Sequence, residues 1–113
     1  MCKVGGVKLN MIIDSGSDAN IIGWEEWSKM KEGGVQIIEQ VKGSDHVFMG
    51  YANHKQLKVM GTFKAEIEVG GKKLLDLFYV IKEGQRSLLG RETAQKLGVL
   101  KMGLNVNEVT QSM

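Results

Sequence analysis

The alternation of apolar and polar positions along the chain predicts mainly β-strands. From residue 62 to residue 69, apolar side chains alternate with polar or charged ones. A period of two is typical of a strand that buries one face and exposes the other. The pair Gly70-Gly71 follows, and a second apolar segment covers residues 73–81. We therefore expect these two segments to form a hairpin.

Other short apolar segments are separated by turns, most of them rich in glycine, and predict further strands. We expect these at residues 3–8 (a hairpin around Gly5-Gly6), 9–13, 20–23, 35–41, 47–52, 56–60, 87–89, 99–102 and 104–109. Residues 24–31 suit a helical turn with Trp24, Trp27 and Met30 on one face. Only residues 90–97 predict a clear helix, which Gly98 would end. The pattern predicts an all-β domain with one C-terminal helix.

Length and composition narrow the class of protein. The 113 residues suit a single domain covering 1–113. The net charge of +2 is too small to favour nucleic acid or a membrane surface, so we predict neither partner. No apolar segment approaches the length of a transmembrane helix. One cysteine, Cys2, excludes an internal disulfide, and an intracellular setting is the default expectation.

The most informative segment for chemistry is the acidic turn after residues 11–13. Three large apolar residues lead directly into Asp14, and Ser15 and Gly16 follow. Burying a carboxylate beside apolar side chains is costly unless the fold requires it there. Glycine allows a sharp turn and a close approach of a ligand to the backbone. Aspartic proteases hold their catalytic acid in this way.

The chain contains only one such turn. Two-lobed aspartic proteases carry two turns on a chain about two to three times the length of one typical domain. If Asp14 is catalytic, the second aspartate must come from a second copy of the chain. The active unit would then be a symmetric homodimer with its site on the two-fold axis.

Two motifs together resemble the retroviral-type (retropepsin-like) aspartic protease family. The first is Asp14-Ser15-Gly16-Ser17, and the second is the segment LLGRE at residues 88–92. The family pairs an Asp-(Thr/Ser)-Gly-(Ala/Ser) turn with an apolar-apolar-Gly-Arg-(Asp/Asn) segment that opens a C-terminal helix. Residues 88–100 look most similar to proteases of gypsy-type LTR retrotransposons. The resemblance implies a retropepsin-like acid protease fold, a small closed barrel-like monomer that acts as a homodimer.

The resemblance also implies roles for individual residues. Asp14 would be the catalytic aspartate, Ser15 would form hydrogen bonds across the dimer axis, and the Gly16 carbonyl would meet the substrate backbone. Asp18 and Arg91 would form an ion pair at the base of the site. Residues expected to line the cleft, its pockets or its flap are Ser17, Asp18, Ala19, Ile21, Gly50, Tyr51, Ala52, Asn53 and Leu88.

The resemblance also implies roles for larger segments of the chain. A hairpin at about residues 46–60 would be the flap that closes over substrate. The C-terminal helix would cover about residues 90–97, and strands within about residues 99–111 would contribute to the dimer interface. Val106 and Val109 are the candidate interface residues there, in place of an N-terminal strand that many family members use.

The implied activity is hydrolysis of peptide bonds by a water molecule between two aspartates, without a metal or other cofactor. The expected substrate is an extended peptide in a Gag-Pol-like polyprotein, and the expected location is the cytoplasm or a retroelement particle. The alternative is a non-proteolytic dimer of the same fold that binds peptides or acts as a scaffold. Ser15 and Ser17 have no His or Lys base beside them in the sequence, which argues against a serine hydrolase. His46 and His54 lack partners at metal-ligand spacing.

Overall fold

A long antiparallel hairpin forms the centre of the computed structural model, which describes residues 2–42, 47–50, 55–82 and 86–100. Strand β7 (Lys55–Val69) pairs with β8 (Lys72–Ile81), and both glycines of the connecting turn have positive φ angles. The predicted alternation is confirmed, because Phe63, Ala65 and Ile67 are buried while Lys64 and Glu66 are exposed. The two segments expected at 56–60 and 62–69 are one strand with an irregularity between Val59 and Gly61.

The N-terminal segment adds a second hairpin to one side of β7. Strand β1 (Cys2–Val4) pairs with β2 (Val7–Leu9) and with β7, and the turn between β1 and β2 is at Gly5-Gly6. The prediction of one strand over residues 9–13 is wrong, because β2 ends at Leu9 and β3 begins at Ile12.

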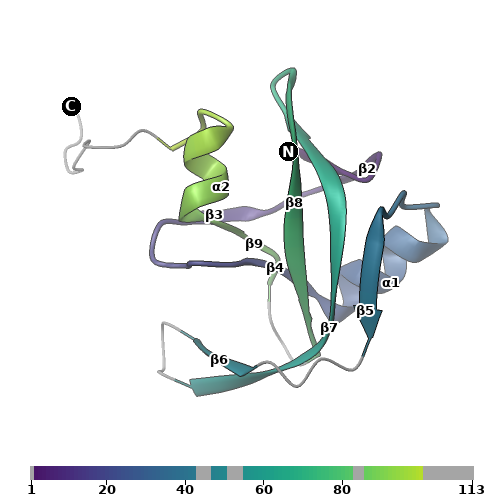
Figure 1. Cartoon of the computed structure of the whole chain (residues 1–113), viewed down its shortest axis with the longest axis vertical. Helices are drawn as coiled ribbons and strands as arrows, with labels where there is room; N and C mark the ends of the chain where they lie inside the picture. The colour runs from purple at the N-terminus through teal and green to yellow at the C-terminus, as the bar shows by residue number, and fades with distance from the viewer. Residues whose placement is uncertain (1, 43–46, 51–54, 83–85, 101–113) are drawn as a thin grey trace.

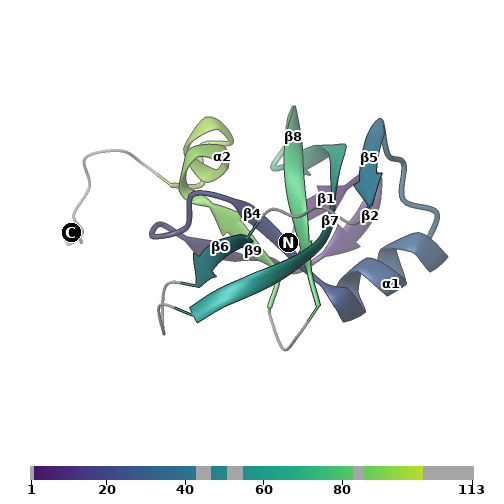
Figure 2. The same ribbon diagram turned by 60° about the horizontal axis from the view of Figure 1, so that its bottom comes forward.

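Three short strands beyond β8 position the acidic turn (Figures 1 and 2). The sheet order is β2-β1-β7-β8-β4-β9-β3, with β4 at Asn20–Gly23, β9 at Leu88–Gly90 and β3 at Ile12–Asp14. Strand β9 lies between β3, to which it is parallel, and β4, to which it is antiparallel. The sheet is curled, and its end strands β2 and β3 do not pair in the described part of the chain. The single chain is therefore a half-barrel rather than a closed barrel.

Two further strands pair with β7. Strand β6 (Val47–Gly50) pairs with its first residues and β5 (Glu39–Lys42) with its middle. The strand expected at 35–41 begins four residues later, and all four residues of β5 are exposed. The apolar side chains of Val35 and Ile37 instead pack against the core from the connection before β5.

The segment expected to be a single helical turn is a full helix, α1 (Trp24–Glu32). Acidic residues in its first turn and lysines in its last turn complement the helix dipole. Trp27 and Met30 are buried, whereas Trp24 is 38% exposed. Helix α2 (Arg91–Lys96) lies within the range predicted for the C-terminal helix. The two helices lie on opposite sides of the β7/β8 hairpin (Figures 1 and 2).

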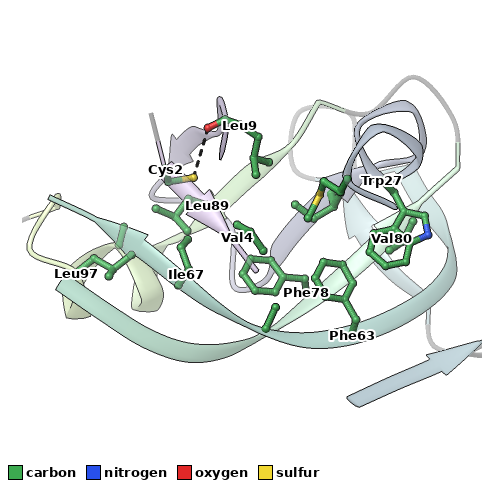
Figure 3. Close-up of a cluster of buried hydrophobic side chains, with 14 residues drawn as sticks. Cys2, Val4, Leu9, Trp27, Phe63, Ile67, Phe78, Val80, Leu89 and Leu97 are labelled. Atoms are coloured by element: carbon green, nitrogen blue, oxygen red, sulfur yellow. Dashed lines mark hydrogen bonds between the residues drawn. The ribbon is translucent and has the colours of Figure 1, made fainter. Parts of the chain in front are cut away.

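The core is centred on three stacked aromatic rings (Figure 3). The Phe63 ring lies 4.6 Å from the Trp27 ring and 5.1 Å from the Phe78 ring, measured between centroids. At the other end of the core, Cys2 is buried and its Sγ lies 3.6 Å from the Leu9 carbonyl oxygen. Burial raises the pKa of this thiol, consistent with a small strand residue rather than a reactive one.

Most of the strand and interface residues that we predicted near the C-terminus lie outside the described residues. Residues 101–113, including Val106 and Val109, are not described, and Val99 and Leu100 are not in a strand. No helix in the described part of the chain is long and apolar enough to cross a membrane.

Candidate active site

Asp14 is the last residue of β3, where that strand runs parallel to β9. The register places Asp14 opposite Gly90, the residue that precedes α2. Its side chain is half-buried, and the backbone N–H of Gly16 donates a hydrogen bond to its Oδ1 atom at 2.9 Å. No hydrogen bond to the second oxygen, Oδ2, occurs within the described residues. One carboxylate oxygen is thus oriented by the turn, and the other is available for chemistry.

Ser17 holds the turn together from inside the protein. Its backbone N–H donates to the Asp14 carbonyl at 3.0 Å, and its hydroxyl donates to the Ala19 carbonyl at 2.7 Å. Its carbonyl accepts a hydrogen bond from the backbone N–H of Arg91 at 2.9 Å. The Ser17 side chain is fully buried, so the expectation that it lines the cleft is wrong. Its hydroxyl satisfies buried backbone groups instead.

The second motif contacts the first through Gly90. A β-carbon on Gly90 would lie 2.9 Å from the carbonyl oxygen of Ala19, a distance that real side chains do not tolerate. The absence of a side chain therefore lets β9 pass directly against the turn that follows Asp14. This close approach explains why position 90 is a glycine.

A buried polar network fixes the position of Gly90. Asn20 is 4% exposed, and its side-chain oxygen accepts a hydrogen bond from the Gly90 N–H at 2.8 Å. Its side-chain amide donates to the Leu77 carbonyl and to the Thr93 hydroxyl, which in turn donates to the Asp76 carboxylate. The network connects β4, β8, β9 and α2 beside the candidate catalytic residue.

The sequence interpretation missed this network. Its members lie 17 to 73 positions apart in the chain, so no local motif links them. An asparagine at the start of an otherwise apolar strand was the only available signal, since buried amides are hydrogen-bonded in folded proteins.

The predicted ion pair between Asp18 and Arg91 forms, with Oδ1 and Nη2 separated by 3.1 Å. The two side chains are 74% and 53% exposed. Exposed ion pairs contribute roughly 0–1 kcal/mol to stability, so this pair orients the two motifs rather than stabilising the fold strongly.

The apolar residues before Asp14 are more exposed than we expected. Ile12 is 39% exposed and Ile13 is 43% exposed, because β3 pairs with no described strand other than β9. Side chains alternate along a strand, so Ile12 shares the face of Asp14 and Ile13 points to the opposite face. The aspartate is therefore flanked by uncovered apolar surface instead of a closed apolar pocket.

The remaining candidate residues are placed as follows. Leu88 is half-buried, Ala19 is half-buried, Ser15 is exposed, and Ile21 is only 2% exposed in the single chain. Gly50 ends β6, which pairs with β7 as a flap hairpin requires. The predicted flap residues Tyr51, Ala52 and Asn53 lie outside the described residues.

Several solved structures resemble this chain, among them the following two. The EIAV protease, in complex with the inhibitor HBY-793, superimposes with a TM-score of 0.69 at 17% sequence identity, covering 88% of this chain and 86% of that protein. The retroviral protease-like domain of Ddi1 from Leishmania major gives a TM-score of 0.52 at 15% identity, covering 84% and 72% of the two chains. The chain has a retropepsin-like fold. A scan against models of known protein families finds no match.

The retropepsin-like fold confirms the predicted all-β class. At these identities the similarity shows the fold and does not by itself assign the activity.

Proposed function

We propose that this chain is an aspartic endopeptidase of the retroelement type that acts as a symmetric homodimer. The observation that carries the proposal is the Asp14 carboxylate. One of its oxygens accepts the Gly16 N–H, and the other has no hydrogen-bond partner within the described residues. The retropepsin-like fold supports the same conclusion.

The mechanism needs two such carboxylates. In the proposed dimer, the two Asp14 side chains would face one another across the two-fold axis. Two carboxyl groups at hydrogen-bond distance do not both ionise, because their negative charges repel. The pair therefore shares one proton and titrates as a unit. The ionised member takes a proton from a water molecule, and the protonated member polarises the carbonyl of the scissile peptide bond. Asp18 and Arg91 hold the two motifs in place but do not touch the reacting atoms.

The proposed substrate is an extended peptide within a Gag-Pol-like polyprotein. An extended peptide can add as a strand between the β6/β7 hairpin and the strands that carry Asp14 and Leu88. The similarity of residues 88–100 to gypsy-type retrotransposon proteases supports this substrate and a location in the cytoplasm or in retroelement particles. The proposed reaction requires no cofactor.

Cleavage of a peptide library near pH 5 tests the proposal, with wild type compared to Asp14→Asn at several protein concentrations. We expect activity that rises faster than linearly with concentration, because the monomer holds half of the site. It should disappear in the variant and be inhibited by pepstatin. Circular dichroism and sedimentation should show that both proteins fold and associate equally.

A folded, dimeric wild type that cleaves nothing would contradict the proposal and favour a peptide-binding or scaffold dimer. Activity that survives in Asp14→Asn would contradict it in a different way, since the carboxylate would then be dispensable.

A further inference from the structure

A hollow of about 440 Å³ lies beside the strand that carries Asp14. It is bordered by the start of β3, the first turns of α1 and the two ends of the connection between β8 and β9. Its described lining includes three apolar side chains, one hydroxyl and five charged groups. These are Met11, Ile12, Trp24, Ser87, Glu25, Glu26, Lys29, Lys82 and Arg86.

The hollow is within reach of the candidate catalytic carboxylate. Ile12 lies two residues before Asp14, so the two side chains leave the same face of β3 about 7 Å apart. The Ile12 N–H donates a hydrogen bond to the carbonyl of Ser87, which directly precedes β9, at 3.0 Å, and this bond aligns Ser87 with the start of β3. In an extended substrate, side chains on one face also recur about every 7 Å. A side chain close to the scissile bond can therefore enter this hollow.

The charges in the hollow favour an anion. Lys29, Lys82 and Arg86 form no ion pair with any described residue, and among the described lining residues they outnumber the two glutamates. Glu25 and Glu26 lie in the first turn of α1, where they complement a helix N-terminus that lacks a side-chain cap. They therefore offset the helix dipole as well as part of the lysine and arginine charge.

Ser87 adds a hydrogen-bond donor at the wall of the hollow. The residue is 7% exposed, and its Oγ accepts the Gly23 N–H at 3.2 Å. Its own hydroxyl hydrogen has no acceptor within the described residues. A hydroxyl can donate while it accepts, so this hydrogen is free for a ligand carboxylate.

We propose that this hollow is a substrate subsite that selects a glutamate or aspartate side chain within three residues of the scissile bond. Arg86 and Lys82 supply the positive charge, Ser87 supplies a hydrogen bond, and Ile12 packs against the aliphatic part of the side chain. The inference rests on the proposed function, and a symmetric dimer would carry the subsite on both sides of the cleaved bond.

Matched peptides test the subsite. In a peptide that the protein cleaves, each position within three residues of the scissile bond is changed in turn to Glu, Gln or Lys, and kcat/KM is measured. We expect Glu to exceed Gln by about threefold to tenfold at one or more positions, and Lys to be poorest. The preference should shrink as salt screens the charges. Arg86→Gln and Lys82→Gln should reduce it, and Lys8→Gln, an exposed cation on β2, should not.

Binding separates failure of this inference from failure of the proposed activity. Asp14→Asn keeps the whole lining of the hollow, so its affinity for Glu and Gln versions of library peptides can be measured without cleavage. Preference for Glu that depends on Arg86 would support the subsite even if the wild type cleaved nothing. Equal binding of Glu and Gln peptides, binding of neither, or equal kcat/KM values at every position would overturn it.

Discussion

At the scale of single residues, the candidate site depends on groups whose work is to hold backbone in place. The Gly16 N–H orients Asp14, Ser17 satisfies the inside of the turn, and Asn20 holds Gly90 opposite the aspartate. Asn20 is nearly fully buried, and each polar end of its side chain is engaged. A buried polar network of this kind is stabilising only while it is complete, because an orphaned member loses its partner without regaining water.

The prediction at this scale concerns Asn20→Ala. The change would leave the Gly90 N–H and the Leu77 carbonyl without their side-chain partners. We expect it to lower the free energy of unfolding by about 1–3 kcal/mol. Urea denaturation measures the change. Asn10→Ala is the control, because Asn10 is exposed and a surface substitution should stay within about 0.5 kcal/mol. Equal stability of the two variants would show that the network contributes nothing.

At the scale of elements, the β7/β8 hairpin is the support on which the site is built. Strand β7 pairs along its length with β1, β5, β6 and β8, and its inward face supplies Phe63 to the stacked aromatic core. The opposite edge of β8 pairs in parallel with β4, which leads to β9 and then to β3. The position of Asp14 thus depends on packing several strands away from it.

The matching prediction compares a buried with an exposed apolar side chain of this hairpin. Phe63 is 1% exposed, and we expect Phe63→Ala to cost about 3–5 kcal/mol of stability because it leaves a cavity between two other rings. Leu75, which is 52% exposed on β8, should tolerate Leu75→Ala within about 0.5 kcal/mol. Thermal or urea unfolding measures both. If Phe63→Ala is too unstable to purify, Phe63→Leu should show a smaller loss, and a loss no larger than that of Leu75→Ala would contradict the proposed core.

At the scale of the whole molecule, no second described strand pairs with β3, the strand that carries Asp14. Strand β3 ends the sheet order, and Ile12 and Ile13 on it are exposed directly before the candidate catalytic residue. A groove on the far side of this strand is lined by Ile13 together with Met11, Leu89, Val69, Val99 and Cys2. Uncovered apolar surface beside a half-site is what a symmetric dimer would bury.

We expect Ile13→Asn to weaken the proposed homodimer by at least about tenfold in its dissociation constant, because two buried isoleucines would be lost per dimer. Sedimentation equilibrium measures the constant. Ile38→Asn is the matched control, since Ile38 is 69% exposed in the connection before β5, away from the Asp14 edge. If both substitutions change the dissociation constant equally, or if neither changes it, Ile13 does not lie in the dimer interface.

The sequence by itself determined the features that depend on neighbouring residues. The alternation in residues 62–69, the glycine turns and the Asp14-Ser15-Gly16 turn follow from local rules of side-chain direction and backbone freedom. The pairing of the two motifs, seen as the ion pair between Asp18 and Arg91, was predicted through the family resemblance. Local rules also failed in places: residues 24–31 form a full helix because Trp27 and Met30 are buried against the core, which a short segment does not reveal.

Only the tertiary structure decided which side chains are covered. Ser17 is buried within the turn, and Ile12 and Ile13 are exposed at an edge. Asn20 donates a hydrogen bond across the fold to Thr93, which in turn donates to Asp76. The hollow lined by Ile12, Lys82 and Arg86 likewise joins segments about 70 residues apart. Burial and long-range hydrogen bonding depend on which strands become neighbours, and strand order is set by the packing of the whole chain rather than by any one segment.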